Sequence, residues 1–139
     1  MKVMTAALAA VAFLTWTIAA HAQQCGGAKV VYDSTIDSPG EAWRVPGERP
    51  KIILNPALLS LETETVRRFV FAHECGHIRN NSSNELAADC WAVRQGKREG
   101  WLNERNLDEV CASFDDAPAS ESHPSGRARC ANLDRCFNR

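Results

Sequence analysis

The chain has 139 residues, of which 45% are hydrophobic and 24% are charged. Its 16 basic and 17 acidic residues give a formal net charge of −1, so there is no electrostatic basis for binding nucleic acid. A chain of this length forms one domain with a modest core, which disulfide bonds would help to stabilise.

The first 22 residues have the features of an export signal. The positive residue Lys2 precedes an apolar run from Val3 to Ala20, and Ala20-His21-Ala22 matches the A-x-A pattern that signal peptidase prefers. We therefore expect a signal peptide at 1–22 and a mature domain at 23–139, periplasmic or secreted, with no membrane span after cleavage. An uncleaved anchor is the alternative, because the 18 residues of the apolar run approach the lower limit for spanning a bilayer.

The first part of the mature domain predicts a short β-sheet. Lys29 to Ile36 is rich in β-branched residues, and Lys51 to Leu54 has the sequence K-I-I-L before Asn55-Pro56 stops it. Both segments are predicted strands. Ser38-Pro39-Gly40 and Val45-Pro46-Gly47, which lie between them, are predicted turns.

The remainder predicts helices, because apolar residues after Glu62 recur at spacings of three and four. The first helix is expected from about Glu62 to Arg79, ending at Asn80-Asn81. Others are expected to begin near Ser83, to run from Asn103 to Phe114, and to run from about Ser125 to Phe137. Strands followed by a run of helices indicate an α+β fold and not an alternating βαβ arrangement.

The pentapeptide His73-Glu74-Cys75-Gly76-His77 lies in the first predicted helix and has the pattern H-E-x-x-H. Each residue of an α-helix advances about 100°, so His73 and His77 lie about 40° apart and one turn displaced. Two imidazoles can then converge on one metal ion, with Glu74 beside them to accept a proton from a water molecule. These residue types at this spacing suit zinc-dependent hydrolysis of an amide bond.

The six cysteines all lie after residue 22, at positions 25, 75, 90, 111, 130 and 136. An even number in a short exported chain predicts up to three disulfides, and the sequence does not choose among the 15 possible pairings. Cys75 lies midway between the two motif histidines, about 180° round the helix from their face. We expect it in the core or in a disulfide, and not as a metal ligand.

A catalytic zinc needs a third protein ligand and leaves its fourth position to water. Glu85 follows His77 by eight residues, near the start of the next predicted helix, after a segment long enough to reverse direction. Asp89 lies one turn further along, placed to accept a hydrogen bond from a metal-bound imidazole. Alternatively, Ser82 to Glu85 is a capping box in which Glu85 binds the Ser82 backbone N–H. We favour Glu85 as a ligand, because the histidine motif otherwise has no third one.

Together, H-E-x-x-H at 73–77 and E-x-x-A-D at 85–89 resemble the zinc motifs of gluzincin metallopeptidases. Within this group the chain is most similar to the family of the CAAX prenyl endopeptidase and the periplasmic outer-membrane quality-control proteases. Ser122-His123-Pro124, Arg129 and Leu133 match that family's C-terminal S/T-H-P-x-x-x-x-R-x-x-x-L. The short interval between the zinc motifs is closer to the minimal gluzincin domains of stress-response regulators.

The resemblance implies a minimal zincin-like domain: a short β-sheet, then the HExxH helix, the ExxAD helix and C-terminal helices, here stabilised by disulfides. It implies that the edge of the strand at 51–55 aligns an extended substrate. It also implies that His123 lies near the metal, where it stabilises the oxyanion or gates the zinc. The alternative for His123 is an ordinary loop histidine, and Arg129 is expected to form a structural ion pair.

The leading hypothesis is an exported zinc metallopeptidase, a monomer that acts on polypeptides. His73, His77 and Glu85 would bind Zn²⁺, Glu74 would act as general base and then general acid, and His123 would assist the oxyanion. The first alternative is a non-catalytic, disulfide-bonded binding module whose zinc is structural or regulatory. The second is that the motif is accidental and no metal binds.

Overall fold

The computed structural model describes residues 23–114 and 116–139, so the predicted signal peptide at 1–22 lies outside the described residues. Within these ranges the protein has three strands and five helices, an α+β fold as expected. Their order is β1 (Lys29–Tyr32), β2 (Gly40–Trp43), β3 (Lys51–Leu54), α1 (Pro56–Leu59), α2 (Glu64–Asn80), α3 (Glu85–Glu99), α4 (Glu104–Ser113) and α5 (Gly126–Phe137). Of the helices in this part of the chain, none combines the length and apolar character needed to cross a membrane.

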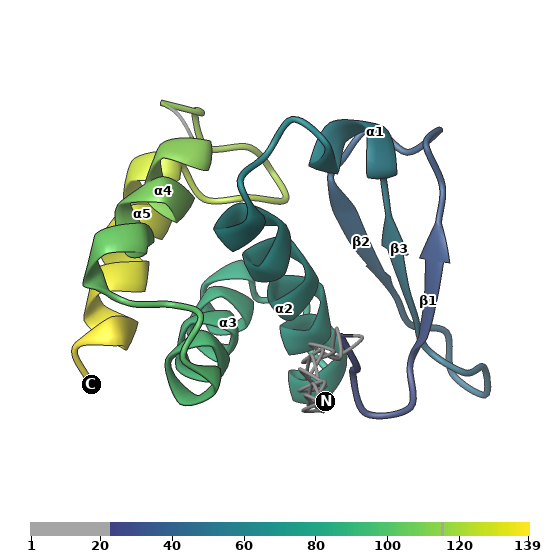
Figure 1. Ribbon diagram of the computed structural model, residues 1–139. Coiled ribbons are helices and arrows are strands. Elements are labelled where there is room, and N and C mark those ends of the chain that lie inside the picture. The colour runs from purple at the N-terminus through teal and green to yellow at the C-terminus, as the bar shows by residue number, and fades with distance from the viewer. Residues whose placement is uncertain (1–22, 115) are drawn as a thin grey trace, which may run out of the picture.

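Helix α2 lies between the sheet on one side and the remaining long helices on the other (Figure 1). Its two apolar faces explain this position. Phe69 and Ala72 belong to a hydrophobic cluster shared with α3, α4 and α5, whereas Phe71 and Cys75 belong to a second cluster with the sheet and α1. The HExxH residues at the middle of α2 are therefore buried between two layers.

The sheet has the strand order β1-β3-β2, with β1 parallel and β2 antiparallel to β3. The central position of β3 explains its apolar sequence, since Ile52 is fully buried. The predicted bounds of β3 are confirmed, but the expectation that its edge is free for substrate is wrong, because both its edges are paired. The free edge beside α2 belongs to β2, part of which was predicted as a turn.

Side-chain caps fix the ends of the helices. Asn81 adopts the left-handed conformation (φ 47°) and ends α2 where the sequence predicted. Asn103 and Ser125 cap α4 and α5, at the residues where these helices were expected to begin. Helix α3 continues through Gly96, where a β-carbon would lie 2.6 Å from that of Leu102, so only glycine lets the following turn pack this closely.

All six cysteines, which lie within the described ranges, form disulfides: Cys25–Cys75, Cys90–Cys136 and Cys111–Cys130. The first ties the segment before β1 to α2, the second joins α3 to α5, and the third joins α4 to α5. Cys75 is 1% exposed and faces the sheet, which confirms that it points away from the histidine face. Three disulfides in so short a chain indicate folding in an oxidising, exported environment.

Candidate metal centre

A tight reversal between α2 and α3 brings the two motifs together. After the left-handed Asn81, the Ser82 N–H donates to the His77 carbonyl (3.1 Å), which satisfies the end of α2. Asn84 then caps α3 by accepting from the Ala87 N–H (2.9 Å). The capping-box alternative is therefore wrong: Asn84 and not Ser82 is the cap, and the Glu85 side chain is directed at the histidines instead of the backbone.

Small residues within both motifs allow α2 and α3 to approach closely. A β-carbon at Gly76 would lie 3.0 Å from both the Cα and the carbonyl oxygen of Ala88, and 3.2 Å from the Trp91 Cβ. Any side chain at position 76 would push the helices apart and carry Glu85 away from the histidines. Sequence reasoning missed this contact, although a glycine inside a helix is itself a signal of close packing.

The three predicted ligand residues meet at one point. His73 Nε2 lies 3.1 Å from His77 Nε2 and 3.1 Å from Glu85 Oε2, and His77 Nε2 lies 3.2 Å from Glu85 Oε1. Tetrahedral coordination with bonds of about 2.0–2.1 Å places ligand atoms about 3.3 Å apart. The two imidazole nitrogens and the two Glu85 oxygens lie near that spacing, so the group can hold a metal ion with one carboxylate oxygen as the third ligand.

The orientation of the two imidazoles is set by their other nitrogens. His73 Nδ1 lies 2.8 Å from Asp89 Oδ1, and His77 Nδ1 lies 2.9 Å from the Ser82 carbonyl oxygen. Carboxylate and carbonyl oxygens only accept hydrogen bonds, so both Nδ1 atoms carry a hydrogen. When neutral, the two Nε2 atoms therefore present bare lone pairs to each other and to the Glu85 carboxylate. This arrangement is stable only if a cation, either a proton or a metal ion, lies among the three acceptors.

The pKa shifts of the metal-free site follow from this geometry. Burial lowers the pKa of His73, but hydrogen bonds to Asp89 and Glu85 outweigh it and raise the pKa to about 9. Burial raises the pKa of Glu85, yet the His73 and His77 imidazoles beside its carboxylate outweigh this and hold the pKa well below its ordinary value. In the absence of metal, a proton on His73 neutralises the Glu85 carboxylate.

Metal binding is consequently expected to release about one proton at pH 7.5, because the bound imidazole must be neutral. Higher pH removes the competing proton, so apparent affinity should rise about tenfold per pH unit up to the His73 pKa of about 9. Isothermal titration calorimetry of Zn²⁺ binding in buffers with different ionisation enthalpies measures this release. Binding without proton uptake by the buffer would contradict the expectation that His73 is protonated before it binds the metal.

We call His73, His77 and Glu85 the metal group. Glu74 lies beside this group and against the sheet. It is 8% exposed, and a β-carbon added at Gly40 of β2 would lie 3.1 Å from its Cγ and 3.4 Å from its Oε1. Burial raises the pKa of Glu74, although the charges of His73 and His77 oppose this shift. The carboxyl is thus near the site, close to the edge strand and more basic than an exposed glutamate.

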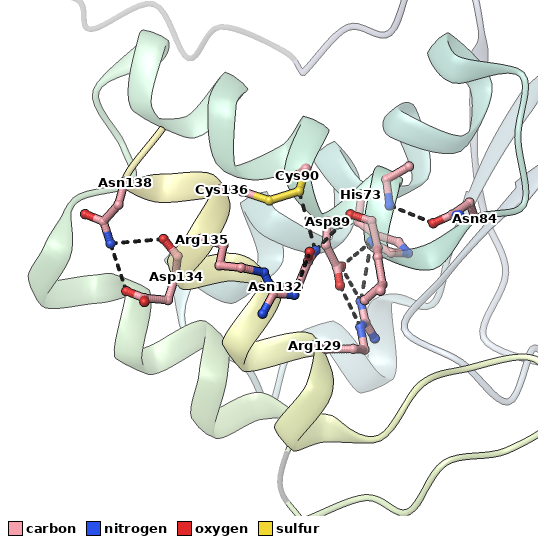
Figure 2. The surroundings of a disulfide bond; sticks show 12 residues. His73, Asn84, Asp89, Cys90, Arg129, Asn132, Asp134, Arg135, Cys136 and Asn138 are labelled. Carbon is pink, nitrogen blue, oxygen red and sulfur yellow. Dashed lines mark hydrogen bonds and ion pairs between the residues drawn. A yellow bond between two sulfur atoms is a disulfide. The ribbon is translucent and has the colours of Figure 1, made fainter.

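Arg129 of α5 supports the site through Asp89, as Figure 2 shows. Its Nε and Nη2 donate to the two Asp89 oxygens at 3.0 and 2.6 Å, and its guanidinium lies 4.1 Å from the centre of the Phe114 ring. Asp89 is fully buried, and the expected structural ion pair of Arg129 is confirmed. The Cys90–Cys136 disulfide joins α3 and α5 nearby (Figure 2).

The loop between α4 and α5 places His123 at the rim of the site. His123 Nε2 lies 3.5 Å from Glu85 Oε2, and its Nδ1 lies 2.9 Å from the Ser122 hydroxyl. The side chain is 53% exposed, so it can move without disturbing the core. His123 thus lies next to the predicted ligands; its catalytic or gating role stays a prediction.

A cavity of about 420 Å³ opens beside Glu74 and His73. It extends between α2, the start of β2 and the loop that joins α4 to α5. The sequence contained no direct signal for this cavity, because its walls come from distant segments, from Ser38 to Arg129, which are 91 positions apart. A molecule that binds at the metal group can therefore extend into this cavity.

No protein-family model, curated protein or solved structure matches the chain. The fold and the site define an exported-type, disulfide-bonded α+β domain with a buried His₂Glu group able to bind a metal ion.

Proposed function

We propose that the protein is a zinc-dependent metallopeptidase that hydrolyses polypeptides in the periplasm or outside the cell, as a monomer. The observation that carries the proposal is the convergence of three acceptor atoms beside a buried glutamate and a cavity. Two imidazole nitrogens and one carboxylate oxygen are a ligand set suited to catalytic zinc. The order of sheet, HExxH helix and ExxAD helix also supports the resemblance to a minimal zincin-like domain.

A zinc ion held by His73, His77 and Glu85 would supply a water acidified towards neutral pH and a Lewis acid for the substrate carbonyl. Glu74 takes the proton of the attacking water and returns it to the leaving amine, a task that its raised pKa suits. Asp89 keeps the His73 ring in one tautomer and one orientation.

The free edge of β2 is suited to align an extended substrate. The Asn55 N–H donates to the Pro39 carbonyl (3.0 Å). This bond fixes which residues of β2 are hydrogen-bonded to β3, because hydrogen-bonded and non-hydrogen-bonded pairs alternate along antiparallel strands. Gly40 and Ala42 must then turn their N–H and C=O groups towards the free edge, where a peptide strand can pair with them. The Ser38 hydroxyl, which donates to the Gly40 carbonyl (3.0 Å), would yield to the substrate N–H. The family resemblance led us to expect that β3 aligns the substrate. We propose that β2 does so instead.

Removal and return of zinc tests the proposal. Protein loaded with one equivalent of Zn²⁺ is expected to cleave an unfolded, disulfide-free polypeptide, to lose that activity on chelation, and to regain it with zinc. Elemental analysis and mass spectrometry of the digest give the two readouts. One tightly bound zinc per chain without hydrolysis would support a non-catalytic binding module, and no bound zinc would make the motif accidental.

A further inference from the structure

Two kinds of residue line the cavity beside Glu74. Some belong to the metal group or its surroundings, namely His73, Glu74, His123 and Arg129. The others come from α2, the start of β2, the end of α4 and the α4–α5 loop. Their apolar members include Val66, Phe69, Val70, Phe114, Ala117 and Pro118.

The charged residues that line the cavity limit what it can accept. Arg129 is already paired with both oxygens of Asp89 and covered by Phe114, so it offers little to an anionic ligand. Glu62 also lines the cavity and would repel a carboxylate. The volume of about 420 Å³ falls within the range of about 300–1,000 Å³ of pockets that enclose small organic groups. A bulky, uncharged, apolar group therefore fits this space best.

The outer wall of the cavity is held in place before any ligand arrives. The Gly126 N–H donates to the Ala117 carbonyl and the Ser120 N–H donates to the His123 carbonyl, both at 2.9 Å. The Cys111–Cys130 disulfide closes the base of this loop by joining the helices on either side of it. A preformed wall lets apolar contacts contribute to affinity without the cost of ordering a loop.

We propose that this cavity binds a large apolar side chain of a polypeptide, and that it selects the residue next to the cleaved bond. The second part rests on the proposed function, because only hydrolysis defines a cleaved bond. The first part does not, since the walls and the contacts that hold them in place do not depend on hydrolysis.

Binding of small amides to the metal-free protein tests the first part. N-acetyl-phenylalaninamide is expected to bind about ten- to a hundredfold more tightly than N-acetyl-glycinamide, as expected for burying one aromatic side chain. N-acetyl-aspartamide should bind no better than the glycine compound. Two-dimensional NMR titration of ¹⁵N-labelled protein measures the affinities and shows whether Phe114 and Gly126 respond. Equal affinities for the phenylalanine and glycine amides would overturn the proposal.

Two loop variants provide a matched pair. Ala117→Trp places an indole at a residue that lines the cavity, and Ala119→Trp makes the same change two residues away at an exposed residue that does not. The first should abolish the preference for phenylalanine and the second should keep it. Retention of the preference in Ala117→Trp would refute the cavity as its origin.

Mapping of cleavage sites in a mixed peptide library, with zinc-loaded protein, tests the second part. Large apolar residues should be enriched at one of the two positions that flank the cleaved bond, and Ala117→Trp should flatten that enrichment. Cleavage without enrichment contradicts the selection, although the proposed function would stand. Absence of cleavage contradicts the proposed function and the selection together, and the amide titration still decides whether the cavity binds apolar side chains.

Discussion

Replacement of Glu74 with Gln is expected to abolish polypeptide hydrolysis while the metal stays bound. Glutamine keeps the size and nearly the shape of the buried side chain, but it cannot take the proton of the attacking water. Loss of a general base lowers rates by about 10²- to 10⁴-fold. Because Glu74 is not one of the three converging donors, the zinc content should remain at one equivalent. The measurements are kcat/KM on an unfolded polypeptide and elemental analysis of the same sample.

The control is Glu64→Gln, the same chemical change on the same helix at an exposed position in the first turn of α2. It should leave both hydrolysis and zinc content unchanged. Unchanged turnover in Glu74→Gln would sink the mechanism. Loss of zinc together with activity would instead place Glu74 among the ligands, although it is not one of the three converging residues.

Local geometry explains why so much of the metal centre could be predicted from the sequence. The rotation of about 100° per residue of an α-helix places His73 and His77 on one face. The same rotation places Cys75 on the opposite face. The beginnings of α4 at Asn103 and of α5 at Ser125 were predicted correctly because a helix start depends on a capping side chain and the backbone two or three residues away.

The remaining features depend on contacts between distant segments. Strand β2 has the sequence G-E-A-W, with no β-branched residue, and it is a strand because β3 offers a free edge to it. The disulfide pairing depends on how α3, α4 and α5 pack, which spacing of cysteines does not encode. Ser82 was a reasonable cap by pattern, but the left-handed turn at Asn81 uses the Ser82 N–H to end α2 and shifts the cap to Asn84.

Replacement of Glu85 with Gln is expected to remove most of the metal affinity. The variant replaces a carboxylate by a neutral amide and leaves two imidazoles, one ligand short of the three that a catalytic zinc site needs. Loss of a group that only supports a ligand costs about 10- to 100-fold in affinity, so loss of the ligand itself should cost at least about 100-fold. Competition with a chromophoric chelator measures the change. In the metal-free variant the pKa of His73 should fall from about 9, because one of its hydrogen-bond partners has lost its charge.

Asn84→Ala provides the contrast, because it removes the actual cap of α3 and leaves all three donor atoms in place. It should lower the free energy of unfolding by about 0.5–2 kcal/mol, and metal affinity should change far less than in Glu85→Gln. If Glu85 were only a capping residue, the two variants would both lower stability and both keep the metal. Zinc affinity retained in Glu85→Gln would therefore remove Glu85 from the ligand set, and His123, whose Nε2 lies 3.5 Å from Glu85 Oε2, would be the next side chain to substitute.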